Sequence, residues 1–147
     1  MDNDKVILEL RDVSKIYESV NALSNINLKV KKGDWIAIMG SSGSGKTTMM
    51  NIIGCMDKPS IGEVILDGQD ITKESQNSLT KIRREKIGLI FQQFHLIPYL
   101  TALENVMVAQ YYHSIPDEQE ALQALERVGL KDRAKHLPSQ LSGGEQQ

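Results

Sequence analysis

A single cysteine, Cys55, means that the chain cannot form an internal disulfide bond. The cysteine stands in an apolar segment, where a small buried side chain is a more common role than a reactive thiol. A reducing compartment such as the cytosol therefore fits the sequence.

Long apolar runs are lacking as well, since none approaches the roughly 20 residues that a membrane-spanning helix needs. An excess of basic residues is also absent, because the net charge is −2 and no basic stripe occurs. This balance argues against nucleic acid as the main partner. With 147 residues of ordinary composition, the sequence amounts to one globular domain.

The strongest motif is the stretch Gly40–Thr48, which fits G-x-x-x-x-G-K-[ST], the phosphate-binding P-loop. Before it, Asp34–Met39 is short, apolar and β-rich, which predicts a buried strand. After it, Thr48–Ile53 predicts the start of a helix. A strand, a glycine loop and a helix N-terminus together aim backbone N–H groups at one point, which suits a polyphosphate. The alternative is a chance match in a Gly/Ser loop, and the flanking pattern argues against it.

Each position of this motif has an expected task. Gly43 and Gly45 let the backbone bend close to the phosphates. Lys46 is expected to reach the β- and γ-phosphates, and the Thr47 hydroxyl is expected to hold Mg²⁺. The expected nucleotide-binding set in this loop is Gly40, Ser41, Ser42, Gly43, Ser44, Gly45, Lys46, Thr47 and Thr48.

Periodicity and turn signals outline the other elements. Strands are predicted at Val6–Leu10, Ile26–Val30, Glu63–Leu66 and Ile87–Phe91, with a tight turn at Asp67–Gly68. Helices are predicted at Ser78–Lys86, from the capping box Thr101–Glu104 to about Tyr111, and along the apolar stripe Ala121, Leu122, Leu125 and Val128, which Gly129 closes.

Two further residues are candidates by position. Tyr17 lies 23 residues before Gly40, and its ring could stack on adenine. A surface or packing role is the alternative, and spacing alone does not decide between them. Gln92 follows the strand predicted at Ile87–Phe91, where a glutamine can touch Mg²⁺ or the attacking water. Taken alone, that glutamine is a weak signal.

The sequence ends on Leu141–Gln147, in which Ser142–Glu145 is again a helix-start pattern. The sequence stops within the first turn, and one turn does not sustain itself in water. We therefore expect the sequence to be a fragment.

With the P-loop and Leu141–Glu145 about 100 residues apart and in this order, the chain resembles the ATPases of ATP-binding cassette (ABC) transporters. Asn51–Pro59 and Ile87–Pro98 look like the subfamily of macrolide-exporter and lipoprotein-releasing ATPases. By this resemblance, Tyr17 is the adenine-stacking residue, and Lys46 and Gln92 are catalytic, with Gln92 and Thr47 at Mg²⁺. The resemblance also implies that Ser142, Gly143 and Gly144 contact the ATP of a second subunit.

The fold implied by the resemblance is α/β. A P-loop core with an antiparallel β subdomain takes about residues 1–95, and a helical subdomain takes about residues 96–147, ending in Leu141–Glu145, the family's signature motif. The implied activity is ATP hydrolysis with Mg²⁺ that drives export, or lipid or lipoprotein release, through transmembrane permease subunits. The implied location is the cytoplasmic face of the cell membrane. The implied partners are the permease subunits and a second ATPase subunit, and no nucleic acid is expected among them.

The sequence departs from this family pattern in one respect: no apolar run ends in Asp-Glu. The Walker B aspartate, the catalytic glutamate and the switch histidine of the family therefore have no counterpart, and we expect the 147-residue chain alone to be inactive. The alternatives are a naturally truncated nucleotide-binding module without turnover and a non-transport ABC ATPase. A plain P-loop kinase does not explain Leu141–Glu145. The cargo is not encoded in this sequence.

Overall fold

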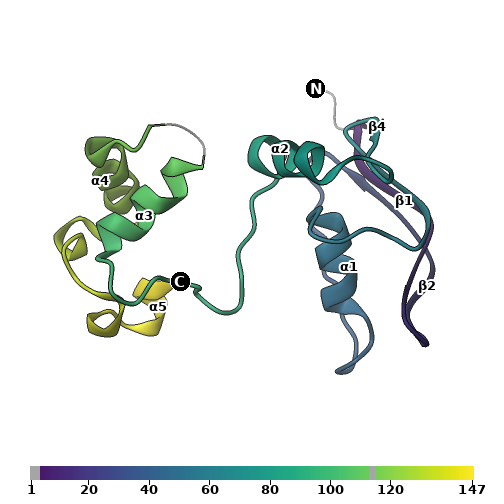
Figure 1. Ribbon diagram of the computed structural model, residues 1–147, viewed down its shortest axis with the longest axis horizontal. Helices are drawn as coiled ribbons and strands as arrows, with labels where there is room; N and C mark the ends of the chain where they lie inside the picture. The colour runs from purple at the N-terminus through teal and green to yellow at the C-terminus, as the bar shows by residue number, and fades with distance from the viewer. Residues whose placement is uncertain (1–3, 113–114) are drawn as a thin grey trace. The chain divides into compact units, whose positions relative to one another are not determined.

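The computed structural model describes residues 4–112 and 115–147, and these divide into two compact units, one before and one after the boundary between Leu89 and Ile90. Figure 1 shows their helices and strands in chain order. The first unit contains β1 (Val6–Tyr17), β2 (Val20–Lys31), α1 (Lys46–Ile53), β3 (Ile61–Leu66), β4 (Gln69–Asp70) and α2 (Gln76–Lys86). The second contains α3 (Ala102–Tyr111), α4 (Glu118–Arg127), two 3₁₀ turns at Lys131–Arg133 and Pro138–Gln140, and α5 (Gly143–Gln146).

The sheet of the first unit is antiparallel and four-stranded, in the order β2-β1-β3-β4. The strands predicted at Val6–Leu10, Ile26–Val30 and Glu63–Leu66 are confirmed, each inside a longer strand. The turn between β3 and β4 is the predicted Asp67–Gly68, with φ angles of 50° and 82°. Two consecutive positive φ angles are the signature of the two-residue hairpin turn that matches the twist of the strands.

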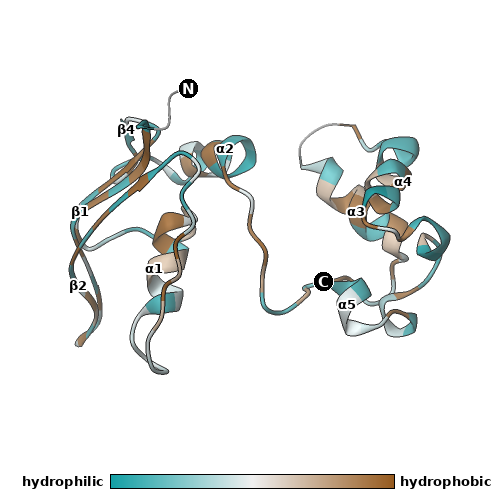
Figure 2. Ribbon diagram, turned by 180° about the vertical axis from the view of Figure 1, so that it is seen from behind, coloured by the Kyte–Doolittle hydropathy of each residue, from teal (hydrophilic) through white to brown (hydrophobic). Residues whose placement is uncertain are grey.

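One face of this sheet carries the core. Leu8, Leu10 and Val64 point to the same side, because alternate residues of a strand share a face, and they pack with Ile52 of α1 and Leu79 of α2. Figure 2 shows the apolar residues of α1 at its C-terminal end, while its first turn is polar. The C-terminal end of α1 is therefore anchored in the core, while its N-terminal end follows the glycine loop directly.

Two of the predicted strands are wrong. Asp34–Met39 and Ile87–Phe91 are not strands, and Trp35 is fully exposed while Ile90 is 88% exposed. A strand exists only through backbone hydrogen bonds to a neighbouring strand. Among the described residues, no such backbone ladder joins either segment to a strand. Both segments have the composition of buried strands, but in the described residues neither is hydrogen-bonded to a neighbouring strand.

The helices of the second unit follow the predicted signals closely. Thr101 caps α3 and forms a reciprocal capping box with Glu104, as predicted. Ala121 and Leu125 of α4 are buried as predicted, but Val128 is 68% exposed, so its assignment to the apolar stripe is wrong. The reason is that α4 ends at Arg127, and past that point the helical period no longer turns a side chain inward. Across the described ranges, we find no helix with both the length and the hydropathy that a membrane span requires.

Candidate functional site

The glycine loop before α1 is held against β2 by a close backbone approach. Gly45 is the N-cap of α1 and has a φ of 86°, in the left-handed region that glycine adopts without strain. A Cβ atom built on Gly45 would lie 2.4 Å from the carbonyl oxygen of Ala22 and 2.8 Å from Cδ2 of Leu23. Only a glycine lets the loop lie this close to β2, so the P-loop pattern corresponds here to a defined packing contact.

Lys46 lies in the first turn of α1, and its side chain folds over the loop. Its Nζ donates hydrogen bonds to the carbonyl oxygen of Gly40 at 2.9 Å, to that of Ser41 at 2.6 Å and to Oγ of Ser44 at 3.3 Å. The ammonium group is thus placed at the mouth of the loop by the loop's own oxygens. A lysine so placed is a point charge directed at whatever anion the loop binds.

A cavity of about 580 Å³ lies between the loop and the start of β2. Its walls are Val20, Asn21 and Ala22 on one side and the run from Ser42 to Thr48 on the other. Pockets for small ligands commonly have volumes of about 300–1,000 Å³. The exposed Thr47 hydroxyl is a hard oxygen donor at this wall. Such a donor suits Mg²⁺, which usually takes one or two protein ligands and fills its other positions with phosphate oxygens and water.

Tyr17 ends β1 beside this cavity, since its register partner on β2 is Val20. Its hydroxyl donates a hydrogen bond to Oδ2 of Asp57 at 2.6 Å, and the residue as a whole is 43% exposed. That hydrogen bond, and then burial, raise the pKa of Tyr17 above its ordinary value, while an interaction with the Thr48 side chain opposes them. The structure therefore brings Tyr17 together with the loop, as a stacking role requires.

Two residues of this site escaped the sequence reasoning. The Lys15 ammonium lies over the Tyr17 ring, 4.8 Å from its centroid, and 2.7 Å from Oδ1 of Asp57. Burial alone would raise the pKa of Asp57, but hydrogen bonds from Lys15, Tyr17 and the Lys58 N–H lower it overall. The proximity of Lys15 to Tyr17 could have been inferred from the sequence, because residues two apart on a strand share a face. Asp57 has no such signal, since it reaches Tyr17 across 40 positions of the chain.

The remaining candidates lie in the second unit. Gln92 is exposed, in the irregular segment that precedes α3. Ser142 caps α5: its Oγ accepts from the Glu145 N–H at 3.3 Å, and its own N–H donates to Glu145 at 2.8 Å. Gly143 and Gly144 are exposed in the first turn of α5. The helix start is confirmed, and the roles of these four residues toward a nucleotide stay predictions.

No metal centre is evident in residues 4–112 and 115–147, where no three His, Cys, Asp or Glu side chains are grouped to hold an ion.

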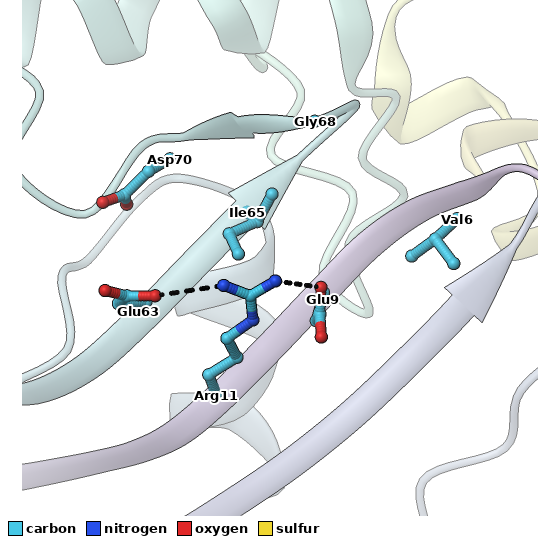
Figure 3. A pocket seen from close by; sticks show the side chains of 7 residues that line it. All are labelled: Val6, Glu9, Arg11, Glu63, Ile65, Gly68 and Asp70. Atoms are coloured by element: carbon cyan, nitrogen blue, oxygen red, sulfur yellow. Dashed lines mark hydrogen bonds and ion pairs between the residues drawn. The ribbon is translucent and has the colours of Figure 1, made fainter.

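A second pocket, of about 450 Å³, lies on the outer face of the sheet (Figure 3). There Arg11 lies between Glu9 at 2.9 Å and Glu63 at 3.4 Å, and Lys29 pairs with Glu9 at 2.9 Å. Hydrogen bonds from Arg11 and Lys29 lower the pKa of Glu9 to about 2. These charges neutralise one another, as on an ordinary sheet surface.

Comparison with known proteins gives a consistent result. Residues 23–147 match the family model described as ABC transporter. The chain is similar to the uncharacterized ABC transporter ATP-binding protein YvrO of Bacillus subtilis, with 49% identity over 96% of this chain and 65% of that protein. It is also similar to the macrolide export ATP-binding/permease protein MacB of Vibrio parahaemolyticus, with 46% identity over 97% of this chain and 23% of that protein.

A solved structure shares the fold as well. It is a dimer of the ATP-binding cassette MJ0796 of Methanocaldococcus jannaschii in a post-hydrolysis state, bound to ADP and Pi. The TM-score is 0.82 at 46% identity, over 95% of this chain and 65% of that one. The expected fold class is therefore confirmed: α/β, of the ABC ATPase type. The chain spans 65% of the length of YvrO and a smaller share of MacB.

Proposed function

We propose that this chain, which belongs to the ABC transporter family, forms the nucleotide-binding part of an ATPase that drives transport through membrane subunits. The observation that carries the proposal is the loop cavity of about 580 Å³, with Lys46 held at its mouth and Tyr17 beside it. A phosphate chain and a purine base are the two chemical groups that these walls suit.

The loop and Lys46 bind the phosphates. The N-terminus of α1 and its preceding glycines supply N–H donors, and the dipole of the helix favours negative charge at the same point. Lys46 exchanges its bonds to the loop oxygens for bonds to phosphate oxygens of higher charge. Thr47 would hold Mg²⁺ through its hydroxyl, and the ion would supply positive charge that offsets the charge of the phosphates.

Residues of the second unit complete the reaction in this proposal. Gln92 orients the attacking water or contacts Mg²⁺, and Ser142, Gly143 and Gly144 bind the ATP of a second subunit. The capping box supports that role, because Ser142 accepts a hydrogen bond from Glu145 and keeps its hydroxyl proton available to donate. The dimeric form of MJ0796 supports a second copy as the partner.

The transport role is supported by the likeness to MacB, which is named as a macrolide export ATP-binding/permease protein. We propose permease subunits or domains as partners and the cytoplasmic face of the membrane as the location. Export of a drug-like compound or release of a lipid or lipoprotein is the proposed task. Hydrolysis is assigned to the complete protein, and the inactivity of residues 1–147 alone stays a prediction.

Calorimetric titration of the complete protein with Mg²⁺ and ATP tests nucleotide binding. Lys46→Ala should weaken ATP about 10- to 150-fold, because it removes charge-assisted hydrogen bonds of about 1.5–3 kcal/mol. Lys29→Met is the matched control, since Lys29 belongs to the ion pairs on the outer face of the sheet. Unchanged ATP affinity in a folded Lys46→Ala protein would contradict the proposal.

A further inference from the structure

A three-residue cluster, Lys15, Tyr17 and Asp57, stands beside the loop cavity. Both oxygens of Asp57 are used: Oδ2 accepts from the Tyr17 hydroxyl at 2.6 Å, and Oδ1 accepts from Lys15 at 2.7 Å. Oδ1 also accepts from the backbone N–H of Lys58 at 2.7 Å. The Lys15 ammonium donates in addition to the carbonyl oxygen of Lys58 at 2.7 Å. This cluster is more densely bonded than a chance surface pair.

The cluster is also well shielded from water. The side chain of Lys15 is 13% exposed and that of Asp57 is 30% exposed. Charged hydrogen bonds that are partly withdrawn from water are stronger than exposed ones, and their geometry is better fixed. The Lys15–Asp57 pair is therefore a firm attachment point for the Tyr17 hydroxyl.

Asp57 is in turn fixed to the P-loop helix. After α1 ends, the backbone N–H groups of Met56 and Asp57 both donate to the carbonyl oxygen of Asn51, at 2.8 Å and 3.1 Å. The same helix thus begins at the glycine loop and, through the Asn51 carbonyl in its last turn, holds the segment that carries Asp57. The position of the Tyr17 ring relative to the loop is set through α1 and through the β1–β2 register.

The Lys15 ammonium lies over the ring, 4.8 Å from its centroid, so one face of the ring is already covered. Tyr17 as a residue is still 43% exposed, so it remains open to a ligand. A ring fixed at its hydroxyl and covered on one face loses little further freedom when a flat group stacks on the open face.

We propose that Lys15 and Asp57 are positioning residues, which hold the Tyr17 ring in place to stack on the nucleotide base and so set affinity for the base rather than for the phosphates. This inference rests on the proposed function. It assigns to Lys15 and Asp57 a task in base recognition, beyond a contribution to the stability of the fold.

The test compares two probes, ATP and inorganic tripolyphosphate, titrated with Mg²⁺ into the complete protein and its variants. Tyr17→Ala should weaken ATP about 5- to 150-fold, the range found for loss of one base–aromatic stack. Asp57→Ala and Lys15→Met should weaken ATP about three- to tenfold and leave tripolyphosphate within about twofold. Lys29→Met should change neither probe.

Two further variants separate positioning from general stability. Tyr17→Phe removes the hydroxyl that bonds to Asp57 and interacts with the Thr48 side chain, and it leaves the Lys15–Asp57 pair intact, so it should give a loss of ATP affinity smaller than that of Tyr17→Ala. In the double variant Tyr17→Ala/Asp57→Ala, the ATP affinity should equal that of Tyr17→Ala alone, because Asp57 acts only through the ring.

The outcomes are distinct. Equal weakening of ATP and tripolyphosphate by Asp57→Ala, or no change in either, overturns the positioning role and leaves the proposed function standing. Additive losses in the double variant also overturn it. A parent protein that binds neither probe contradicts the proposed function itself.

Discussion

Replacing Gly45 by alanine should destabilise the fold much more than the same change at Gly43, two residues earlier in the same loop. Both glycines have positive φ angles, 86° at Gly45 and 80° at Gly43. A residue with a Cβ atom at such an angle costs about 1–2 kcal/mol. Gly43 has no atom within 4 Å of an added Cβ, so Gly43→Ala should cost only that amount.

At Gly45 the new methyl group would in addition lie 2.4 Å from the carbonyl oxygen of Ala22. That oxygen belongs to the backbone of β2 and cannot turn away as a side chain does. Overpacking of this kind costs about 1–3 kcal/mol, so the sum for Gly45→Ala is about 2–5 kcal/mol. The stiffening of the unfolded chain by an alanine is common to both variants and cancels in the comparison.

Urea denaturation of the complete protein, followed by far-ultraviolet circular dichroism, gives the free energy of unfolding of each variant. Gly45→Ala should also weaken ATP, because the loop must move away from β2 to make room for the methyl group. Free energies of unfolding that agree within about 0.5 kcal/mol for the two variants would refute the reasoning, since the close approach to β2 would then carry no energetic weight.

Two other predictions concern the second unit and the sheet. Gln92→Ala should lower phosphate release and coupled transport more than it lowers ATP affinity, and normal rates of both in the variant would dismiss the assignment. The pKa values of Glu9 and Asp67 are about 2, below their ordinary values of 4.5 and 3.8. Their ion pairs should therefore stabilise the fold fully at pH values above 4.5 and 3.8, and this contribution should be lost as the pH falls toward 2. Urea midpoints measured between pH 7 and pH 2 report this loss of stability. Lys29→Met removes one partner of Glu9, so the midpoint should fall less steeply with pH in this variant than in the parent protein. An identical fall in the variant and the parent would contradict the assignment to Glu9.

The features predicted well from the sequence are those that a few adjacent residues decide. The Asp67–Gly68 turn and the capping box at Thr101 each depend on a short pattern with its own hydrogen bonds. The helix after the loop is of the same kind, although it begins at Lys46, two residues before the predicted Thr48. A local pattern also defines the glycine loop that we propose binds nucleotide, which is why the candidate site could be located before the fold was known.

The features predicted wrongly or missed depend on distant partners. Asp34–Met39 has the composition of a strand, yet a strand is a property of two segments and not of one. Asp57 could not be linked to Tyr17, because the contact depends on how the chain returns after α1. The tasks proposed for Gln92 and for the Ser142–Gly144 stretch involve a nucleotide, Mg²⁺ and a second subunit, and they stay predictions.

The bonds between Lys46 and its own loop bear on which anions the site admits. Any anion that engages this ammonium must compete with three oxygens that already hold it. A small isolated anion would offer the Lys46 ammonium few contacts in place of the three hydrogen bonds it already makes, so its net gain in binding free energy should be small. A chain of linked phosphates offers many oxygens at once and engages the loop N–H groups as well as the lysine. If the loop binds nucleotide as proposed, we therefore expect it to favour a triphosphate, which offers several linked negative groups, over a single small anion.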